Sequence, residues 1–242
     1  PVRVLHNRGD VWLLARVNVS SRTFRNGGGL ICLAIQLLVK LLHRLQVKSF
    51  SKDLIFEALH LHLPVQSGNN RILREMRRMH TVEEYISIIE ELKMVVPDIG
   101  LSTDIIVGYP GESESEFEDT LALMEKIKFN NSYMFSYSSR PNTPAQDFPD
   151  SVPQLVKSAR LQRTIDLQKR LTLEQGKKFI GREVDVLVES ESFKADLDFR
   201  GRNAQYWSVN FTGDKALISP GDIVKVVVEE ASGHMLKGKA VL

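Results

Sequence analysis

The strongest constraint on the fold of this chain is a regular alternation of strand and helix patterns between residues 59 and 175. Three segments have the apolar or alternating composition of strands, namely LHLPVQSG (61–68), LSTDIIVG (101–108) and SYMFSYSS (132–139). Helical patterns separate them, the first at about residues 69–79. Because parallel strands need long helical crossovers between them, this order predicts a parallel α/β sheet or an incomplete (β/α) barrel. In such folds, ligands bind at the C-terminal ends of the strands.

Capping residues mark where two of the helices begin. Thr81 with Glu84, and Ser113 with Glu116, have the spacing of capping boxes, in which side chains satisfy backbone N–H groups of the first turn. Apolar residues recur at helical spacing after each box. A proline-punctuated loop then leads to a long helix predicted over about 153–175.

The pattern changes near residue 177, where short strands with Gly- or Asp-rich turns replace the helices. The strand segments are VDVLVES, QYWSVNF, KALI, DIVKVVVEE and HMLKGKAVL. Strands of this length and spacing are typical of a small barrel. We therefore divide the chain into an α/β domain, residues 1–176, and an all-β barrel of about 65 residues, 177–242.

Composition excludes some classes of protein. The single cysteine, Cys32, excludes an internal disulfide and a multi-thiolate metal site. No apolar run reaches the ~20 residues of a membrane helix, and no signal peptide is visible, so a cytoplasmic protein without membrane contact is expected. Residues 1–50 hold eight basic residues against one acidic, a net charge of +7. Such a segment suits a polyanionic partner, or is the edge of a truncated domain.

The stretch TDIIVGYPGE (103–112) brings a buried strand up to a sharp turn. Gly108, Pro110 and Gly111 would leave the backbone close to whatever lies beyond the strand end, because glycine has no Cβ. The helix that opens at Ser113 presents N–H groups that suit an anionic ligand group. An ordinary tight turn followed by a helix cap is the alternative.

Other polar residues also lie at or near strand ends. Gln66 and Ser67 close the first strand segment, where side chains can contact a ligand, although polar turn residues are common. His62 lies within that strand and is interpreted as a hydrogen-bonded core histidine rather than a metal ligand. Arg140 could hold a carboxylate or phosphate, or be a solvated loop arginine.

Five segments together resemble one known family. HLPVQSG, RRMHTVEEY, TDIIVGYPGE, FSYSSRPNTPA and LQRTIDLQ resemble, in order and spacing, the radical S-adenosylmethionine methylthiotransferases. The nearest branch is similar to the tRNA enzymes that convert N6-isopentenyladenosine beside the anticodon to its 2-methylthio form. The resemblance implies a radical-SAM barrel, incomplete and truncated at its N-terminus. It also implies that S-adenosylmethionine is contacted by Gln66, Ser67, Asp104 and Gly108.

The segments GRNAQYWSVNF (201–211) and PGDIVKVVVEEASGHMLKGKAVL (220–242) resemble the TRAM domain that binds tRNA in this family. The implied partner is the anticodon stem-loop of tRNA, and no DNA is expected. The implied RNA contacts, whose cations and rings suit phosphates and bases, are Arg140, Arg202, Trp207 and Lys237. Ten basic and ten acidic residues over 177–242 argue against strong RNA binding by the barrel alone.

The chemistry of the family requires 4Fe-4S clusters. Three thiolates of a Cys-x3-Cys-x2-Cys loop hold one cluster beside S-adenosylmethionine, and three cysteines of another domain hold a second that delivers sulfur. This chain has only Cys32. We therefore expect a C-terminal part of a methylthiotransferase that is inactive alone. The alternatives are a non-catalytic tRNA-binding chain and a methylthiotransferase of a ribosomal protein.

Overall fold

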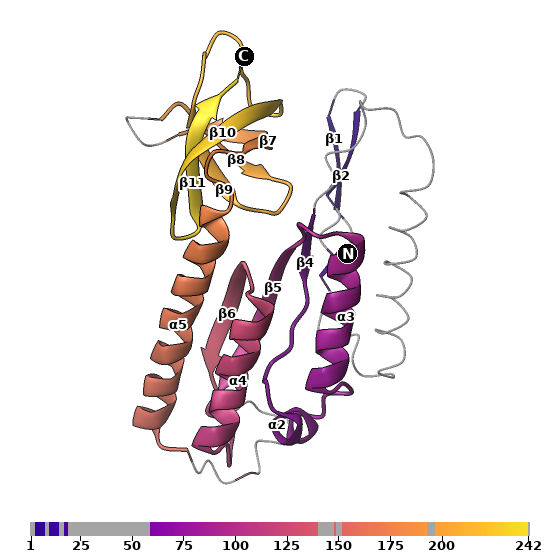
Figure 1. The fold of residues 1–242 in the computed structure, drawn as a ribbon, viewed down its shortest axis with the longest axis vertical. Helices are drawn as coiled ribbons and strands as arrows, with labels where there is room; N and C mark the ends of the chain where they lie inside the picture. Colours follow the sequence, from indigo (N-terminus) through magenta and orange to yellow (C-terminus); the bar gives the residue numbers. More distant parts are fainter. Residues whose placement is uncertain are drawn as a thin grey trace.

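The computed structural model describes residues 59–139, 148, 152–192 and 197–241, together with the backbone of residues 3–7, 10–14 and 17–18. The described elements form an antiparallel hairpin, a parallel sheet with helices, and a closed barrel (Figure 1). The hairpin pairs β1 (Arg3–Asn7) with β2 (Asp10–Leu14). Within the described part of the chain, no helix is both long and apolar enough to cross a membrane.

The parallel sheet has four strands in the order β3-β4-β5-β6. Their bounds are β3 Val17–Asn18, β4 His60–His62, β5 Gly100–Val107 and β6 Asn131–Ser136. Each strand runs parallel to its neighbour. The predicted parallel α/β sheet is therefore confirmed, and its sequential strand order is that of a partial (β/α) barrel.

The helices of this domain are α2 (Asn70–Glu75), α3 (Val82–Val95), α4 (Glu114–Ile127) and α5 (Gln154–Lys177). α2 is shorter than the helix predicted at 69–79, because Arg77 adopts a left-handed φ of 53°. α3 and α4 begin with the predicted capping boxes at Thr81 and Ser113. Between these helices and the sheet lies one apolar core, whose buried members include Leu61, Val65, Tyr85, Ile89, Leu101, Ile105, Phe117 and Met124.

The strand predicted at 61–68 is split in two. β4 ends at His62, since Pro64 has no N–H to donate to the ladder. The N–H of Val65 donates to Oγ1 of Thr103 at 2.9 Å instead. Pairing with β5 resumes one residue later, in an isolated parallel bridge.

α5 contacts the sheet largely through polar side chains. Its buried polar residues, spaced three to four apart, are Lys157, Arg160, Thr164, Gln168 and Thr172. The Gln168 amide donates to the carbonyl of Phe129 at 2.9 Å and accepts from Oγ of Ser132 at 2.9 Å. Thr172 Oγ1 donates to the carbonyl of Asn130 at 2.9 Å. Hydrogen bonds to β6 and to the residues before it therefore fix the position of α5.

Five strands after α5 close into a barrel with the order β10-β11-β9-β8-β7. Their bounds are β7 Glu183–Glu191, β8 Phe199–Asn203, β9 Ser208–Thr212, β10 Ile223–Ser232 and β11 Met235–Ala240. The barrel core includes Val186, Val188, Phe199, Val209, Phe211, Val226 and Leu236. The predicted small all-β barrel is confirmed.

Two details of the barrel differ from the predicted strands. KALI (215–218) is a turn and not a strand. The N–H of Ala216 donates to Oδ1 of Asp214 at 2.8 Å, and the N–H of Leu217 donates to the carbonyl of Asp214 at 3.1 Å. β8 was not predicted as a separate strand, because its outward residues are arginines. Its inward Gly201 lies so close to Leu187 that a Cβ would approach the Leu187 carbonyl oxygen to 2.2 Å.

The barrel packs against the N-terminal ends of the sheet strands. His60, the first residue of β4, stacks on Tyr206 with ring centroids 5.2 Å apart. At Gly100, the first residue of β5, a Cβ would approach the carbonyl oxygen of Gln205 to 2.6 Å. α5 runs along the sheet and leads directly into the barrel (Figure 1).

Candidate functional site

The turn after β5 is held by a carboxylate from its own far end. Gly108 and Gly111 have left-handed φ values of 72° and 73°. The N–H of Gly108 donates to Oε2 of Glu112 at 2.7 Å, and the N–H of Glu112 donates to the carbonyl of Tyr109 at 2.9 Å. The acid that follows the turn in the sequence thus folds back and closes it.

Glu112 is also one partner of a buried ion pair. Its side chain is 0% exposed, and that of Arg160 on α5 is 6% exposed. Nη1 of Arg160 donates to Oε2 of Glu112 at 2.8 Å and to its carbonyl at 3.0 Å. Burial raises the pKa of Glu112, while the Gly108 N–H and Arg160 favour the carboxylate. Since the Gly108 N–H and the Arg160 guanidinium both donate to this carboxylate, we take Glu112 as ionised. Arg160 thereby fixes the position of the turn relative to α5.

The space beside Gly108 is occupied by a side chain of α5. The absent Cβ was expected to leave room for a ligand, but a Cβ at Gly108 would lie 2.5 Å from Cγ of Lys157. Lys157 is a buried residue of α5. The space therefore receives the stem of Lys157, and any ligand contact at this turn would use backbone atoms on another side.

The structure brings Gln66 to the same edge of the sheet as Gly108. The N–H of Gln66 donates to the carbonyl of Asp104 at 2.9 Å, and its carbonyl accepts from the N–H of Ile106 at 2.9 Å. Gln66 is 5% exposed and has a left-handed φ of 77°. Because the paired strands are parallel, Gln66 and Gly108 lie at the C-terminal ends of neighbouring strands.

Ser67 differs from the other predicted cofactor residues. It is 0% exposed, its Oγ lies 3.4 Å from Oγ1 of Thr120 on α4, and it accepts from the N–H of Asn69 at 3.2 Å. Its hydroxyl thus faces the helix layer and joins it to the sheet. The contact of Ser67 with S-adenosylmethionine stays a prediction, and in this conformation its hydroxyl is used within the protein.

Asp104 lies on the sheet face opposite the apolar core. His62 connects it to β4: Nδ1 of His62 lies 2.9 Å from Oγ of Ser102, and its Nε2 lies 3.4 Å from Oδ1 of Asp104. On the other side, Tyr133 of β6 is opposite Asp104 and meets His62 edge-on at 5.7 Å. His62 is thus the buried, hydrogen-bonded histidine that was predicted.

The rest of this face is apolar and accessible. Phe135 is opposite Ile106 in the register, and the residues Tyr133 and Phe135 are 43% and 53% exposed. The Asp104 side chain is 31% exposed. Carboxylate, imidazole and aromatic groups together suit a ligand with hydroxyl groups and a flat ring. Among the described residues, no group of three or more His, Cys, Asp or Glu side chains could hold a metal ion.

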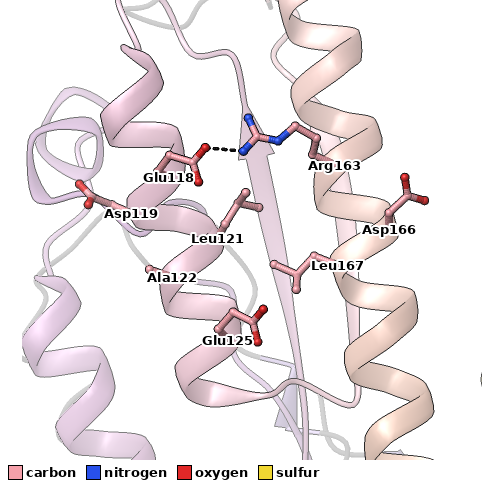
Figure 2. A pocket seen from close by; sticks show the side chains of 8 residues that line it. All are labelled: Glu118, Asp119, Leu121, Ala122, Glu125, Arg163, Asp166 and Leu167. Carbon is pink, nitrogen blue, oxygen red and sulfur yellow. Dashed lines mark hydrogen bonds and ion pairs between the residues drawn. The ribbon is translucent and has the colours of Figure 1, made fainter.

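The outer groove between α4 and α5 has a different character (Figure 2). Four of the eight side chains that line it are carboxylates, from Glu118, Asp119, Glu125 and Asp166. Arg163 is ion-paired with Glu118 across the groove, as Figure 2 shows. The groove is on the helix layer and away from the open sheet face. Its charge repels phosphate, so it is not a candidate site for a nucleotide.

The outer face of the barrel strands β8, β9 and β11 carries cations. The pairing places Arg200, Asn210 and Lys237 in one row across the three strands. Arg200 and Lys239 are exposed. Nε of Arg202 donates to Oε1 of Glu189 at 2.7 Å, and Nζ of Lys237 lies 3.2 Å from Oε2 of Glu230. We call Arg200, Arg202, Lys237 and Lys239 the barrel cation face.

Arg202 also extends an aromatic stack at the domain junction. Its guanidinium carbon lies 4.2 Å from the ring centroid of Tyr206, and that ring stacks on His60. Tyr206 has a left-handed φ of 69°, and its contact with His60 was not predicted from the sequence. Tyr206 therefore connects Arg202 of the barrel cation face to His60, the first residue of β4.

Trp207 does not present a stacking surface. It is 4% exposed, its ring lies 5.8 Å from that of Phe179, and Gly176 packs against it. The RNA contact of Trp207 stays a prediction, and in this structure the residue packs in the core of the barrel. Arg140 and Cys32 lie outside the described residues.

Sequence reasoning missed three of the residues that shape the site: Glu112, Lys157 and Arg160. Glu112 was given no role from the sequence, although its spacing from Gly108 is that of a residue that can close the turn. Lys157 and Arg160 lie three apart on α5, at positions where a buried residue is expected to be apolar. The available signal was the lack of an apolar stripe on so long a helix.

Comparison with known proteins identifies the class. Residues 52–124 match the family described as the radical SAM superfamily, and residues 177–241 match the TRAM domain. The chain is therefore similar to part of a radical SAM domain followed by a TRAM domain, as its sequence resemblance predicted.

The particular relatives are tRNA-2-methylthio-N(6)-dimethylallyladenosine synthases. The enzyme of Flavobacterium johnsoniae is 44% identical over 75% of this chain and 38% of its own length. That of Acetivibrio thermocellus is 43% identical over 80% of this chain and 42% of its own length. The resemblance to tRNA methylthiotransferases is thus confirmed, and the chain spans about two fifths of the length of these relatives.

A solved structure, coproporphyrinogen III oxidase (HemN) from Escherichia coli, aligns over 55% of this chain and 30% of its own. The TM-score is 0.43 and the sequence identity is 21%.

Proposed function

We propose that this chain contributes one edge of the S-adenosylmethionine site and the RNA-binding barrel of a tRNA methylthiotransferase. The observation that carries the proposal is the placement of Gln66, Asp104 and Gly108 at the open face and C-terminal edge of a parallel sheet that continues into a TRAM barrel. The synthases similar to this chain support methylthiolation of tRNA as the reaction of the whole protein.

The residues on the open face fit the nucleoside end of the cofactor. The Asp104 carboxylate would accept hydrogen bonds from ribose hydroxyls, and His62 would hold that carboxylate in place. The exposed rings of Tyr133 and Phe135 would exclude water from one side of the adenine. When bound, S-adenosylmethionine supplies the reactive sulfonium. The Glu112–Arg160 pair would keep the turn at Gly108 rigid beside it.

The residues of this chain do not fit a 4Fe-4S cluster. Such clusters take cysteine thiolates, and the chain has Cys32 alone. We therefore derive no reaction step through a cluster on these residues. This donor set favours the non-catalytic alternative for the chain by itself, namely binding of tRNA without methylthiolation.

The barrel cation face is the proposed contact for the anticodon stem-loop of tRNA. Its cations lie on β8 and β11, which both pair with β9, so they can follow successive phosphates of one backbone. Glu189 and Glu230 neutralise Arg202 and Lys237 only in part, because exposed ion pairs contribute about 0–1 kcal/mol and are readily exchanged for a phosphate.

The test is the salt dependence of RNA binding, measured by fluorescence anisotropy with a labelled anticodon stem-loop. The Arg202→Ala/Lys237→Ala variant should bind more weakly, and its slope of log K against log salt should be smaller by about 1–2. Lys169→Ala, an exposed residue of α5, is the matched control. Wild-type affinity that does not change with salt, or equal slopes in the double variant and the wild type, would contradict the proposal.

A further inference from the structure

A cavity of about 170 Å³ lies at the junction of the sheet domain and the barrel. Its polar lining includes Lys93, Asp98, Lys128, Asn130, Lys178 and Arg182, so that four cations face one carboxylate. The cations come from the last turn of α3, the C-caps of α4 and α5, and the residue just before β7. None of them belongs to the open sheet face or to the barrel cation face.

Two of the four cations have no carboxylate partner within ion-pair distance among the described residues. Nζ of Lys93 donates to the carbonyl of Ile127 at 3.0 Å, and Nζ of Lys178 donates to Oε1 of Gln175 at 2.8 Å. Burial lowers the pKa of Lys93, and the charge of Lys178 lowers it further. The repulsion between these two like charges costs free energy, which an anion bound in the cavity would recover.

The other two cations are only weakly neutralised. Lys128 lies 3.4 Å from Glu174, and Arg182 lies 3.4 Å from Asp98. The four side chains are 40% to 64% exposed, so solvent screens both pairs and each contributes little. The cavity is therefore positively charged, and three of its cations lie on exposed residues that an incoming ligand can reach.

A neutral donor completes the lining. The Oδ1 of Asn130 accepts from the N–H of Leu101 at 2.8 Å, which fixes the orientation of the amide. No hydrogen bond between described residues uses its Nδ2, and Asn130 lines the same cavity. Ammonium, guanidinium and amide donors around one small hollow suit a tetrahedral oxyanion.

Helix ends provide a simpler explanation for part of this cluster. Lys93, Lys128 and Lys178 each lie near the C-terminus of a helix, where a cation interacts favourably with the backbone carbonyls. That explanation accounts for one lysine on each helix. It does not account for the convergence of three helix ends on one hollow, nor for Arg182, which follows the helices and adds a fourth cation.

The cavity also adjoins the proposed RNA surface. Gln205, which lines it, precedes Tyr206, and Arg202 of the barrel cation face stacks on Tyr206. A backbone that crosses the barrel cation face toward the sheet would therefore pass the mouth of the cavity. We propose that this junction cavity binds one phosphate group, supplied by the backbone of the RNA that the barrel holds. This proposal rests on the RNA binding proposed above.

The test compares neighbouring lysines in the full chain. Lys178→Gln and Lys93→Met should each weaken binding of the anticodon stem-loop RNA about 3- to 10-fold at low salt. Each should also reduce the salt slope by about 0.7–0.9, the value for one phosphate contact. Lys177→Gln is the matched control, since Lys177 is exposed, adjacent to Lys178 and not part of the lining. Circular dichroism shows that each variant is folded.

A second arm uses inorganic phosphate as the probe. If the cavity binds free phosphate instead, millimolar phosphate at constant ionic strength should raise the Tm of the wild type but not that of Lys178→Gln. RNA binding would then be the same in the lysine variants as in the wild type. This combination overturns RNA as the source of the phosphate. Unchanged RNA slopes together with no effect of phosphate overturn the cavity as a phosphate site. If the wild type fails to bind RNA, the proposed function fails, and the phosphate arm still decides the chemistry of the cavity.

Discussion

Glycine has two different roles in the turn after β5. Gly108 and Gly111 share a left-handed φ, which costs an L-residue about 1–2 kcal/mol. Their surroundings differ, because a Cβ at Gly108 would collide with Lys157, whereas a Cβ at Gly111 meets nothing within 4 Å. One position therefore needs glycine for its conformation alone, and the other also for packing.

This difference predicts unequal costs for the same substitution. Gly111→Ala should lower the free energy of unfolding by about 1–2 kcal/mol, and Gly108→Ala by about 1–3 kcal/mol more, because it also overpacks the contact with α5. Denaturant unfolding of the two variants measures the difference. Lys157→Ala added to Gly108→Ala should recover part of the loss. Equal losses for the two glycines would show that Lys157 moves aside freely.

At the scale of elements, one arginine connects two loops of the candidate site. Nη2 of Arg71, in α2, donates to the carbonyl of Gly111 at 2.8 Å and to Oε2 of Glu116, in α4, at 2.7 Å. The hydrogen bond from Arg71, together with the capping hydroxyl and N–H of Ser113, lowers the pKa of Glu116 to about 2. The carboxylate charge of Glu116 thus joins the segments after β4 and β5, and protonation at low pH removes that charge.

Stability at acid pH should reveal this connection. Because the folded-state pKa of Glu116 is below its ordinary value of 4.5, its stabilisation is complete above pH 4.5 and is lost as the pH falls toward 2. We expect about 1–2 kcal/mol, less than the full shift implies, since Arg71 is 41% exposed and solvent screens the pair.

The measurement is the free energy of unfolding of wild type and Glu116→Gln between pH 7 and pH 2. The difference should be largest at pH 7 and should vanish near pH 2. Arg71→Met removes the same interaction from the other side and should also flatten the acid limb. A difference that stays constant with pH would mean that the carboxylate charge is not what joins the two segments.

The secondary-structure elements that local chemistry dictates were predicted well. Thr81 and Ser113 start their helices as their capping boxes indicated, because those contacts span only three residues. α5 was located correctly, but its inward face was not, since Gln168 is buried by partners 36 to 39 residues away. The burial of Trp207 was not predicted for the same reason, because composition shows an aromatic ring and cannot show that Phe179 packs against it.

The sequence predicted those positions in the candidate site that follow from the order and direction of the strands. Parallel pairing alone places Gln66 and Gly108 at one edge, and alternation along β5 places Asp104 on one face. The direction in which Ser67 points was not predictable, because it depends on a left-handed residue before it and on Thr120 of α4. Glu112 and Arg160 are 48 residues apart and meet only after the domain has folded.

At the scale of the whole molecule, the isolated chain should not perform methylthiolation. A site-differentiated 4Fe-4S cluster needs three protein thiolates, and Cys32 supplies one. Two chains together would supply only two. After anaerobic treatment with iron, sulfide and S-adenosylmethionine, we expect substoichiometric iron and no 5′-deoxyadenosine.

Iron and acid-labile sulfide analysis, with chromatographic assay of 5′-deoxyadenosine, provides the measurement. A synthase that carries all its cysteines, treated in parallel, is the positive control. Binding of about four iron atoms per chain together with cofactor cleavage would refute this prediction. RNA binding by the same preparation would show that the negative result does not come from unfolded protein.

The distance between the two ends of α5 sets a length scale for any RNA that uses both regions. The helix has 24 residues, about 36 Å at 1.5 Å per residue. Arg160 anchors its first turns beside the Gly108 turn, and its last residue leads into the barrel. The length of α5 therefore sets a minimum length for such an RNA. A trinucleotide is too short to reach from the barrel cation face to the cofactor edge, whereas a structured stem with its loop can span that distance. Selection among RNAs would then depend on their reach as well as on their bases.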